Sequence, residues 1–394
     1  MTRFREQVSA EKYFTFSIVG LLLAFVLLPN SKWVANYYYV FVLLPATALL
    51  LTLRVPKQPL KPLLILWLSF AFWLLTSGAH GGDFGYFKHW GYLVAFCVVM
   101  VSWVEFRRFR TPRFFEACFI MLGAYILIST FVLWAQGAPV GERILELPLR
   151  LSGPILTSML LVALLTACLP AWHSEAKIWR IAVAFALALF CVGFVLQSRS
   201  GLVGLVAVTA GYCCYLLMLT KGRFLRLVVL VMVGVSVASV IWALEYVESL
   251  QMLVSRGDSG RFELWSAYLR ELNQCGVFWG CGPSFVAEIY VMDGTLLIQH
   301  PHNIFLVAIV YHGLLALILL LVLSCATLWY AWQQKNPWGL YLLVALLMLQ
   351  FDGNRLVNRP DEIWLLVYLP CMLILAEAVR IRDTPGGKEL SSAG

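Results

Sequence analysis

The chain has 394 residues, a formal net charge of +8 at neutral pH, 61% hydrophobic and 13% charged residues, and a mean hydropathy of +0.83. Soluble domains are about 45 to 50% apolar and about 25% charged, so this composition excludes a soluble multidomain protein. The apolar residues come in runs of roughly 17 to 25, which is typical of transmembrane helices. The positive charge does not indicate nucleic-acid binding, because Lys and Arg gather on the cytoplasmic side of membrane helices.

The apolar runs predict an all-α polytopic membrane protein with about twelve transmembrane helices. The first run is not followed by a small-residue cleavage site, so we interpret it as a retained helix rather than a removed signal peptide. The predicted helices cover residues 14–29, 37–53, 62–78, 90–104, 114–135, 152–171, 179–196, 201–219, 224–245, 302–331, 338–351 and 363–379.

The distribution of Lys and Arg predicts the orientation of these helices. If the N-terminus is cytoplasmic, most basic residues fall on the cytoplasmic side, as the positive-inside rule expects. The C-terminus is then cytoplasmic too, and residues 381–394 are predicted to form a disordered tail. The basic residues that remain on the outer side break the rule and are candidates for function: Lys32, Lys88, Arg143, Arg150, Arg199, Arg256, Arg261, Arg270, Arg355 and Arg359.

One polar connection, from about residue 245 to residue 300, is far longer than the others and lies on the outer side. Connections of this length in compact proteins are usually functional, so it predicts a small loop domain between helices 9 and 10. The chain then divides into helices 1–9 (residues 1–245), the loop domain (246–301), helices 10–12 (302–380) and the tail (381–394).

The loop domain is expected to contain a helix that begins near Gly260. Its apolar residues share one helical face, Phe262, Trp265, Leu269 and Leu272. Cys275 and Cys281 follow this helix, and in an oxidising compartment they could form a disulfide, although the sequence leaves the pairing open. The other cysteines lie in apolar runs and are interpreted as small buried hydrophobes.

Two arginines on the outer side suit a phosphate. Arg199 lies in a hairpin so short that it must sit at or just within the outer interface, where an arginine is costly and therefore a functional candidate. The alternative is an arginine that snorkels at a helix end. Arg261 falls in the first turn of the loop helix, whose N–H groups and positive end favour phosphate. The alternative for Arg261 is an ion pair with Asp258 or Glu263.

Two histidines stand at the start of the tenth apolar run. Pro301 suits the first position of a helix, so His302 is expected in the first turn, where the positive helix end favours a neutral imidazole that can accept a proton. His300, before the proline, is expected to be extended and to point elsewhere, and it is treated as secondary. The alternative is an interfacial histidine that only hydrogen-bonds the backbone.

Two arginines for a polyanion and one neutral histidine for a hydroxyl proton suggest group transfer from a phosphorylated lipid at the outer leaflet. The arginines can neutralise a leaving diphosphate, so this chemistry requires no metal or other cofactor. The chain has no Asp-x-Asp pair, Walker loop or Cys-x-x-Cys motif to support nucleotide or metal chemistry. Asp352, Asp361 and Glu362 share the last outer loop and leave a cation site open there.

The order of these motifs resembles that of the O-antigen ligase and polymerase superfamily of bacterial inner-membrane proteins. Arg199-Ser200-Gly201 resembles the family's arginine at the outer end of a helix, and Ser259-Gly260-Arg261 resembles the arginine motif that opens its periplasmic-loop helix. Gly280-Cys281-Gly282 resembles the glycine pair that follows. His300-Pro301-His302-Asn303 resembles the family's His-x-His-Asn segment, in which the histidine before Asn is catalytic.

The resemblance implies a GT-C-like, multi-pass glycosyltransferase of the bacterial inner membrane, with cytoplasmic termini and an active site that faces the periplasm. It implies metal-independent, inverting transfer of a glycan from undecaprenyl diphosphate to the lipid A core, among membrane lipids and without nucleic acid. His302 would be the base, and Arg199 and Arg261 would hold the diphosphate. Further substrate contacts are expected from His300, Asn303, Arg143, Arg150, Arg355 and Arg359.

Alternatives remain within the superfamily and outside it. An O-antigen polymerase and a protein O-oligosaccharyltransferase are the alternatives within it. A polymerase is expected to need two anionic diphosphate handles and to have a less uniform histidine motif, so the intact His-Asn segment favours the ligase modestly. A twelve-span secondary transporter belongs to another class, and the scarcity of intramembrane charges and the single long outer loop count against it.

Overall fold

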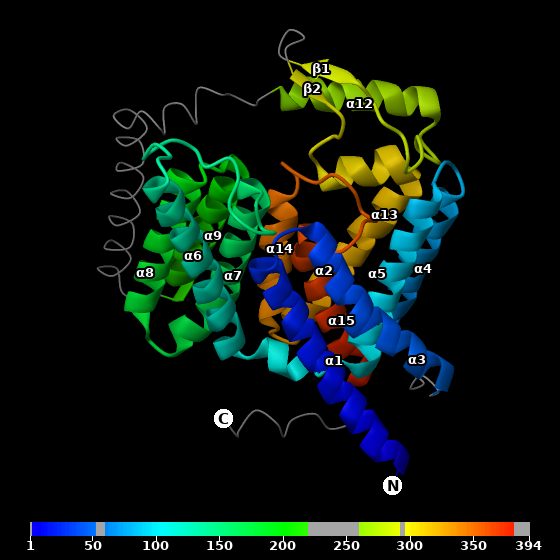
Figure 1. Ribbon diagram of the computed structural model, residues 1–394, viewed down its shortest axis with the longest axis horizontal. Helices are drawn as coiled ribbons and strands as arrows, with labels where there is room; N and C mark the ends of the chain where they lie inside the picture. Colours follow the sequence, from blue (N-terminus) through cyan, green and yellow to red (C-terminus); the bar gives the residue numbers. More distant parts are fainter. Residues whose placement is uncertain (1, 53–59, 220–259, 292–295, 382–394) are drawn as a thin grey trace.

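The computed structural model describes residues 2–52, 60–219, 260–291 and 296–381, and the account below concerns these residues. They are mostly helical, with one short β-hairpin (Figure 1). The elements in chain order are α1 (Thr2–Leu27), α2 (Ser31–Tyr38), η1 (Tyr39–Leu43), α3 (Leu44–Thr52), α4 (Pro62–Gly78), α5 (Phe84–Trp103), η2 (Phe106–Arg110), α6 (Pro112–Ala135), α7 (Pro154–Ser174), α8 (Ile178–Leu189), η3 (Phe190–Val195), α9 (Arg199–Leu219), α12 (Arg261–Cys275), β1 (Ile289–Val291), β2 (Leu296–Ile298), α13 (Ile304–Gln333), α14 (Pro337–Met348), η4 (Trp364–Tyr368) and α15 (Leu369–Arg380).

Within the described residues, 8 helical spans are long and apolar enough to cross a membrane, as expected of a polytopic membrane protein. Each predicted span in this part of the chain coincides with one helix or with helices in direct succession. The span predicted at 224–245 lies outside the described residues. The total of about twelve spans and the GT-C-like arrangement stay predictions.

Short polar residues and prolines set where the helices begin. Asp83 accepts a hydrogen bond from Tyr86 N at the start of α5, and Asn336 accepts one from Trp338 N at the start of α14. Proline occupies the first positions of α4, α6, α7 and α14, where its missing N–H removes a group that the first turn leaves unpaired in any case.

The helices pack around α7, whose residues are mostly buried and which contacts α6, α8, α9 and α14. On the other side of the bundle α13 packs along α4, and α15 packs on α5. Gly204 allows α9 to approach α14 closely, because a Cβ at this position would overlap the side chain of Met348. α14 also contacts α13, so it links α9 to the helix that follows the histidines.

The described part of the loop domain lies at one end of the bundle. α12, β1 and β2 sit together above the start of α13, whereas α1 begins and α15 ends at the opposite end (Figure 1). At that opposite end Arg380 Nη2 donates to Glu11 Oε1 (2.5 Å). This arrangement agrees with the predicted orientation, which itself stays a prediction.

The expectation of an all-α fold agrees with the described residues, apart from one short β-hairpin in the loop domain. Ile289–Val291 and Leu296–Ile298 pair as an antiparallel hairpin, with Ile289 opposite Ile298. The two strands contain β-branched and aromatic residues, which favour extended backbone.

The apolar face predicted for the loop helix is right for Leu272 and wrong for Phe262 and Leu269. The buried residues of α12 are Leu264, Tyr268 and Leu272, whereas Phe262 is 68% exposed and Leu269 is 46% exposed. α12 lies at one end of the bundle, where outward apolar side chains suit a membrane interface. Both faces of the helix therefore carry apolar residues, and their spacing alone does not show which face is buried.

Candidate functional site

His302 lies just before α13 rather than within it. Asn303 is the N-cap, because its side chain accepts hydrogen bonds from Phe305 N (2.9 Å) and Leu306 N (3.1 Å). The expectation that Pro301 opens the helix and places His302 in its first turn is therefore wrong. Asn303 satisfies two N–H groups that proline cannot satisfy, so it decides where the helix starts.

The backbone and the side chain of His302 are both unusual. Its φ of 49° lies in the left-handed region, which costs free energy for a residue with a side chain. Its imidazole Nδ1 lies 3.0 Å from Asp352 Oδ1, in the loop that follows α14. Strained residues of this kind gather at functional sites, where the surrounding contacts hold them in place.

Asp352 is itself held in position. Gly353 N donates to Asp352 Oδ1 (2.7 Å), and Gly353 has a φ of 133°, which suits glycine alone. The same loop is joined to α13, because Ile304 N donates to Leu349 O (2.9 Å). Burial has the largest single effect and raises the pKa of Asp352, but the hydrogen bond and charge of His302 and the N–H of Gly353 together outweigh burial, so the pKa lies below its usual value. Asp352 is therefore a carboxylate at neutral pH.

His300 is the neighbour of His302 in space as well as in sequence. The two ring centroids are 3.9 Å apart, so the expectation that His300 points elsewhere is wrong. Burial, followed by the proximity of His302, lowers the pKa of His300 to about 4. His300 is therefore neutral at pH 7 and places no positive charge beside His302.

α12 brings Arg261 to the same place. Trp265 Nε1 donates to Pro301 O (3.0 Å), which ties α12 to the segment that carries both histidines. The Arg261 guanidinium carbon lies 5.8 Å from the ring centroid of Phe351, the residue before Asp352. The start of α12 and the Asp352 loop therefore meet at one site.

Arg199 is the first residue of α9, and the local sequence fixes this helix start. Ser198 Oγ accepts a hydrogen bond from Gly201 N (3.3 Å), as an N-cap residue does. One turn further along, Gly204 lies against Met348, the last residue of α14. α14 leads directly into the Asp352 loop, so the first turns of α9 pack against the end of α14 that precedes this loop.

A basic cavity opens beside His300. It measures about 470 Å³ and is lined by residues of α5, α13, the 283–286 segment and the loop after α14. Arg355 and Arg359 line it, as does His89, which the sequence analysis did not single out. Among the described residues neither of these arginines forms an ion pair with a carboxylate. The cavity therefore has a positive field suited to an anionic group.

Arg150 does not face this cavity. Its Nη1 and Nη2 donate to Glu362 Oε1 and Oε2 (2.5 and 2.9 Å), and its side chain is 10% exposed. Its backbone N–H donates to Leu28 O (2.9 Å). Arg150 thus joins the loop at 136–153 to α1 and to the last helix, an arrangement that argues against the substrate contact expected for it. Arg143 lies in the same loop and is half-buried.

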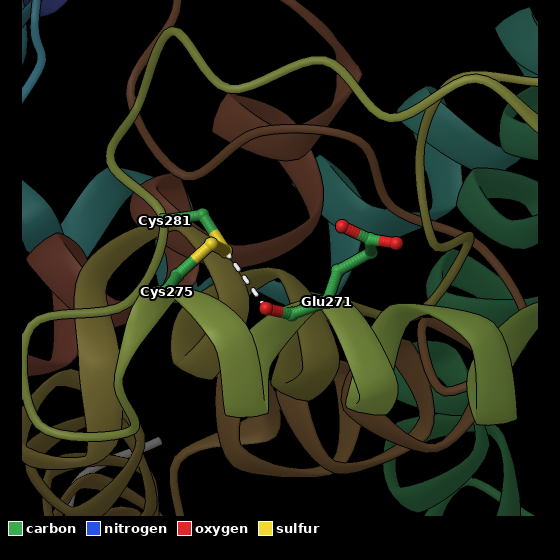
Figure 2. The surroundings of a disulfide bond; sticks show 3 residues. All are labelled: Glu271, Cys275 and Cys281. Carbon is green, nitrogen blue, oxygen red and sulfur yellow. Dashed lines mark hydrogen bonds between the residues drawn. A yellow bond between two sulfur atoms is a disulfide. The ribbon is translucent and has the colours of Figure 1, made fainter.

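The two cysteines of the loop domain form a disulfide (Figure 2). Cys275 is the last residue of α12, and Cys281 follows the turn-rich segment after it. Glu271 O lies 3.8 Å from Cys281 Sγ, and because a disulfide sulfur carries no proton this is a packing contact rather than a hydrogen bond. The sequence left this pairing open, and the structure resolves it.

Three residues of the site were missed or undervalued in the sequence. Asp352 is 50 positions from His302, so no spacing rule links them, and its signal was an acidic residue in an outer loop. Trp265 was assigned to an apolar stripe, although its indole N–H serves the site. His89 lies directly before the apolar run at 90–104 and belongs to no recognisable motif. In the part of the chain that is described, no group of three or more His, Cys, Asp or Glu side chains is arranged to hold a metal ion.

Comparisons with known proteins agree with the motifs. Residues 183–321 match the family model described as O-Antigen ligase, a range that contains Arg199, Arg261 and His302. The chain is also 26% identical over 381 residues to the O-antigen ligase of Pseudomonas aeruginosa strain PAO1, across 89% of this chain and 88% of that protein. The family resemblance predicted from the motifs is confirmed.

Proposed function

We propose that this chain transfers a polysaccharide from undecaprenyl diphosphate to the lipid A core, and the match of residues 183–321 to the O-antigen ligase family model supports this proposal. The transfer takes place at the periplasmic face of the bacterial inner membrane, by an inverting mechanism that needs no metal. The family match and the relative that covers 89% of this chain support ligase- or polymerase-type glycosyl transfer, and the long apolar helices support an integral membrane protein.

The contact between His302 and Asp352 is the observation that carries this proposal. With Nδ1–H donated to Asp352, the lone pair of Nε2 is available to accept a proton. Nε2 takes the proton of the acceptor hydroxyl while the hydroxyl oxygen attacks the anomeric carbon of the donor. The bond from that carbon to the diphosphate oxygen breaks, and undecaprenyl diphosphate leaves. Attack from the opposite face inverts the anomeric configuration.

Arg199 and Arg261 take the leaving diphosphate. A guanidinium presents a planar fork that matches phosphate oxygens, and its fixed charge stabilises the negative charge that develops as the bond breaks. Arg199 and Arg261 are the first residues of α9 and α12, so two separate helices would each contribute one arginine to diphosphate binding. The two arginines thereby supply the charge neutralisation that a cation supplies in other transferases.

The basic cavity is assigned to the acceptor. Lipid A core is anionic, and Arg355 and Arg359 give this cavity its positive charge. His300 lines the cavity beside the base and would contact the acceptor sugar, whereas Asn303 holds the start of α13 through its side-chain oxygen. Lys32, Lys88 and Arg143 extend the route for anionic lipid, and we leave Arg150 out of it because Glu362 occupies its guanidinium.

A strain that lacks this gene tests the proposal on a lipopolysaccharide gel. We expect lipid A capped by core alone, while the long polymer accumulates on undecaprenyl diphosphate. A plasmid copy of the gene should restore the ladder, and a plasmid copy with His302→Ala should not.

Two outcomes would contradict the proposal. Core that carries single-repeat glycans in the deletion strain would indicate a polymerase. An unchanged ladder would exclude both activities and return attention to other substrates of the superfamily, such as proteins.

A further inference from the structure

α13 is interrupted in its middle. Gly313 has φ 81° and ψ 176°, which are not helical values, so α13 consists of two helical parts joined at a kink. In a continuous helix Leu314 N would donate to Val310 O, four residues earlier. Here Leu314 N donates to Val277 O (2.9 Å), and Val310 O accepts from Cys281 N (2.6 Å). The segment Val277–Cys281, which we call the insert, thus replaces one helical hydrogen bond by two bonds of its own.

Side chains of α4 hold the insert against the kink. Trp73 Nε1 donates to His312 O (2.8 Å), the carbonyl of the residue directly before the kink. The Trp73 ring stacks on Trp279 of the insert, with centroids 5.0 Å apart. Phe278 meets the same ring edge to face, with centroids 5.7 Å apart. The insert is therefore packed between α4 and α13.

Glycines are required where the insert meets α13. A Cβ on Gly313 would overlap the carbonyl of Phe278, and a Cβ on Gly280 would lie 2.6 Å from Val310 O. Both glycines also have positive φ values, 81° and 73°. Glycine is also required at position 282, where a Cβ would lie 2.5 Å from His80 O in the segment after α4. The Gly-Cys-Gly motif thus has a physical purpose, the close approach of two backbones.

The disulfide encloses this insert. Cys275 ends α12, and its partner Cys281 is the residue whose N–H replaces the helical donor to Val310. Gly280 N donates to Gly276 O (3.0 Å), which forms a turn inside the ring that the disulfide closes. A closed ring has fewer conformations than an open loop, so docking it costs less conformational entropy.

We propose that the disulfide Cys275–Cys281 is a latch that holds the insert in the kink of α13 and thereby positions the catalytic segment. This proposal rests on the function proposed above. α12 is joined to the first part of α13 near both of its ends. Trp265 Nε1 donates to Pro301 O just before α13, and Cys275 is bonded to Cys281, whose N–H donates to Val310 O before the kink. The insert is a positioning element, because it acts on His302 through α13 and does not touch the substrate.

Release of the insert gives α13 a second arrangement. Leu314 N and Val310 O can then pair with each other, and the kink closes into continuous helix. The part of α13 before Gly313 changes direction relative to the part after it, and this moves His302 away from Asp352. The kinked, latched form is therefore the active one of two packed states.

Closing the latch is an oxidation. The thiols of Cys275 and Cys281 lose two protons and two electrons as the S–S bond forms, and a disulfide-bearing oxidant accepts both and becomes a dithiol. Such oxidants act in the periplasm and are scarce in the cytoplasm. In the proposed orientation the enzyme is therefore inactive until its loop domain has reached the oxidising side.

The test is reversible reduction of purified wild-type protein in detergent, with undecaprenyl-diphosphate-linked glycan and lipid A core as substrates. Dithiothreitol should lower kcat by about 10²-fold, as a misplaced base does, while the donor KM changes less than about twofold. Oxidised glutathione should restore the rate. The double variant Cys275→Ser/Cys281→Ser should transfer slowly in both conditions. Cys325→Ser, which removes an exposed thiol of α13 that forms no disulfide, should behave like wild type.

A glycine variant tests the docking separately from the disulfide. Gly313→Ala should show the same loss of kcat in the oxidised protein, because its Cβ overlaps the insert. Gly211→Ala is the matched control, since a Cβ there would meet nothing within 4 Å. Wild-type reduction needs no variant, so misfolding of any variant leaves the test intact.

Hydrogen exchange gives a readout that does not depend on activity. Reduction should raise the exchange rate of the Cys281 amide, which loses its bond to Val310 O. Equal kcat and equal exchange in the oxidised, reduced and double-serine proteins would overturn the latch and leave the proposed function standing. An oxidised wild-type protein that transfers nothing would overturn the proposed function, and exchange alone would then decide whether the latch exists.

Discussion

At the scale of single residues, the proton transfer depends on one imidazole and the two groups beside it. Asp352 lies 3.0 Å from Nδ1 of His302 and is ionised at neutral pH, so it can balance the charge that the ring gains when it accepts a proton. His300 cannot compete for this proton, because its pKa is lowered to about 4. The site thus has two adjacent histidines with different roles, one that can take the proton and one that stays neutral.

Substitutions of the base His302 and of its partner Asp352 should lower kcat to different extents. His302→Ala should lower kcat by about 10² to 10⁴-fold, because general-base catalysis is lost. Asp352→Asn should cause a smaller loss, because Gly353 N, which donates to Oδ1, keeps the amide oxygen toward Nδ1–H, whereas the charge that balances the imidazolium is lost. Initial rates of transfer and donor binding are measured on purified protein, and donor binding should be unchanged in both variants. A His302→Ala enzyme with more than a tenth of the wild-type rate would refute its assignment as base.

His300 should make the folded protein sensitive to acid. Its pKa falls from 6.5 to about 4 on folding, so the unfolded chain takes up a proton between these values and the folded chain does not. Stability therefore declines as the pH falls through this window. His300→Gln has no such group, and its Tm should fall less between pH 7 and pH 4.5 than that of wild type, measured in detergent. Equal declines in both proteins would show that His300 titrates normally.

At the scale of elements, the sequence predicted the helices whose starts are set by neighbouring residues. It did not predict features that depend on contacts between segments far apart in the chain. Gly260 and the residues after it predicted the loop helix and put Arg261 in its first turn. The predicted start of α13 was wrong, because Pro301 and Asn303 are both typical of helix starts. The side chain of Asn303 caps the helix, so α13 begins at Ile304. The kink at Gly313 had no signal beyond a glycine in an apolar run, because its cause is an insert from another part of the chain.

The hydrogen bond from Trp265 to Pro301 should tune the rate. Trp265→Phe keeps an aromatic ring but loses the donor to the carbonyl beside His302. A hydrogen bond of this kind contributes about 0.5–1.5 kcal/mol, so kcat should fall by roughly two- to tenfold. Trp329→Phe, at a position of α13 that is 64% exposed, is the matched control and should keep the wild-type rate. A Trp265→Phe enzyme with wild-type kcat would show that α12 does not position the histidine segment.

The ion pair of Arg150 and Glu362 should stabilise the bundle without serving catalysis. Arg150→Ala leaves a buried carboxylate without its partner, which costs about 3–5 kcal/mol and should lower the Tm measured in detergent. Arg108→Ala breaks a pair whose side chains are 51% and 36% exposed, and its Tm should change little. If Arg150→Ala instead kept its Tm and lost affinity for the acceptor, Arg150 would return to the substrate route.

At the scale of the whole molecule, the sequence predicted the membrane class and most helix positions, because long apolar runs have few other interpretations. It could not predict how the loops at the outer end join. The loop at 136–153 contacts the start of α9 through Gln197, whose Nε2 donates to Gly141 O (2.8 Å), and it contacts the last helix through Arg150. These contacts join segments far apart in the sequence, and they gather the candidate site at one end of the bundle.

The side of the membrane that this end faces can be measured by cysteine labelling. Glu142 lies in the loop at 136–153 that precedes α7, and Ser174 is the last residue of α7. Both residues are exposed, and the whole length of α7 separates them in the chain. In a protein that keeps the Cys275–Cys281 disulfide and has its other cysteines replaced by serine, Glu142→Cys should react with a membrane-impermeant maleimide in cells whose outer membrane alone is permeable. Ser174→Cys should react only after the inner membrane is broken.

The opposite labelling pattern would reverse the orientation. Because Gln197 joins the Glu142 loop to the turn before Arg199, the label at Glu142→Cys reports the side on which the arginine lies. A reversed pattern would place Arg199 and the disulfide in the reducing cytoplasm. There a donor flipped to the periplasm could not reach the site and the latch could not close, so the proposed function and the proposed latch would fail together.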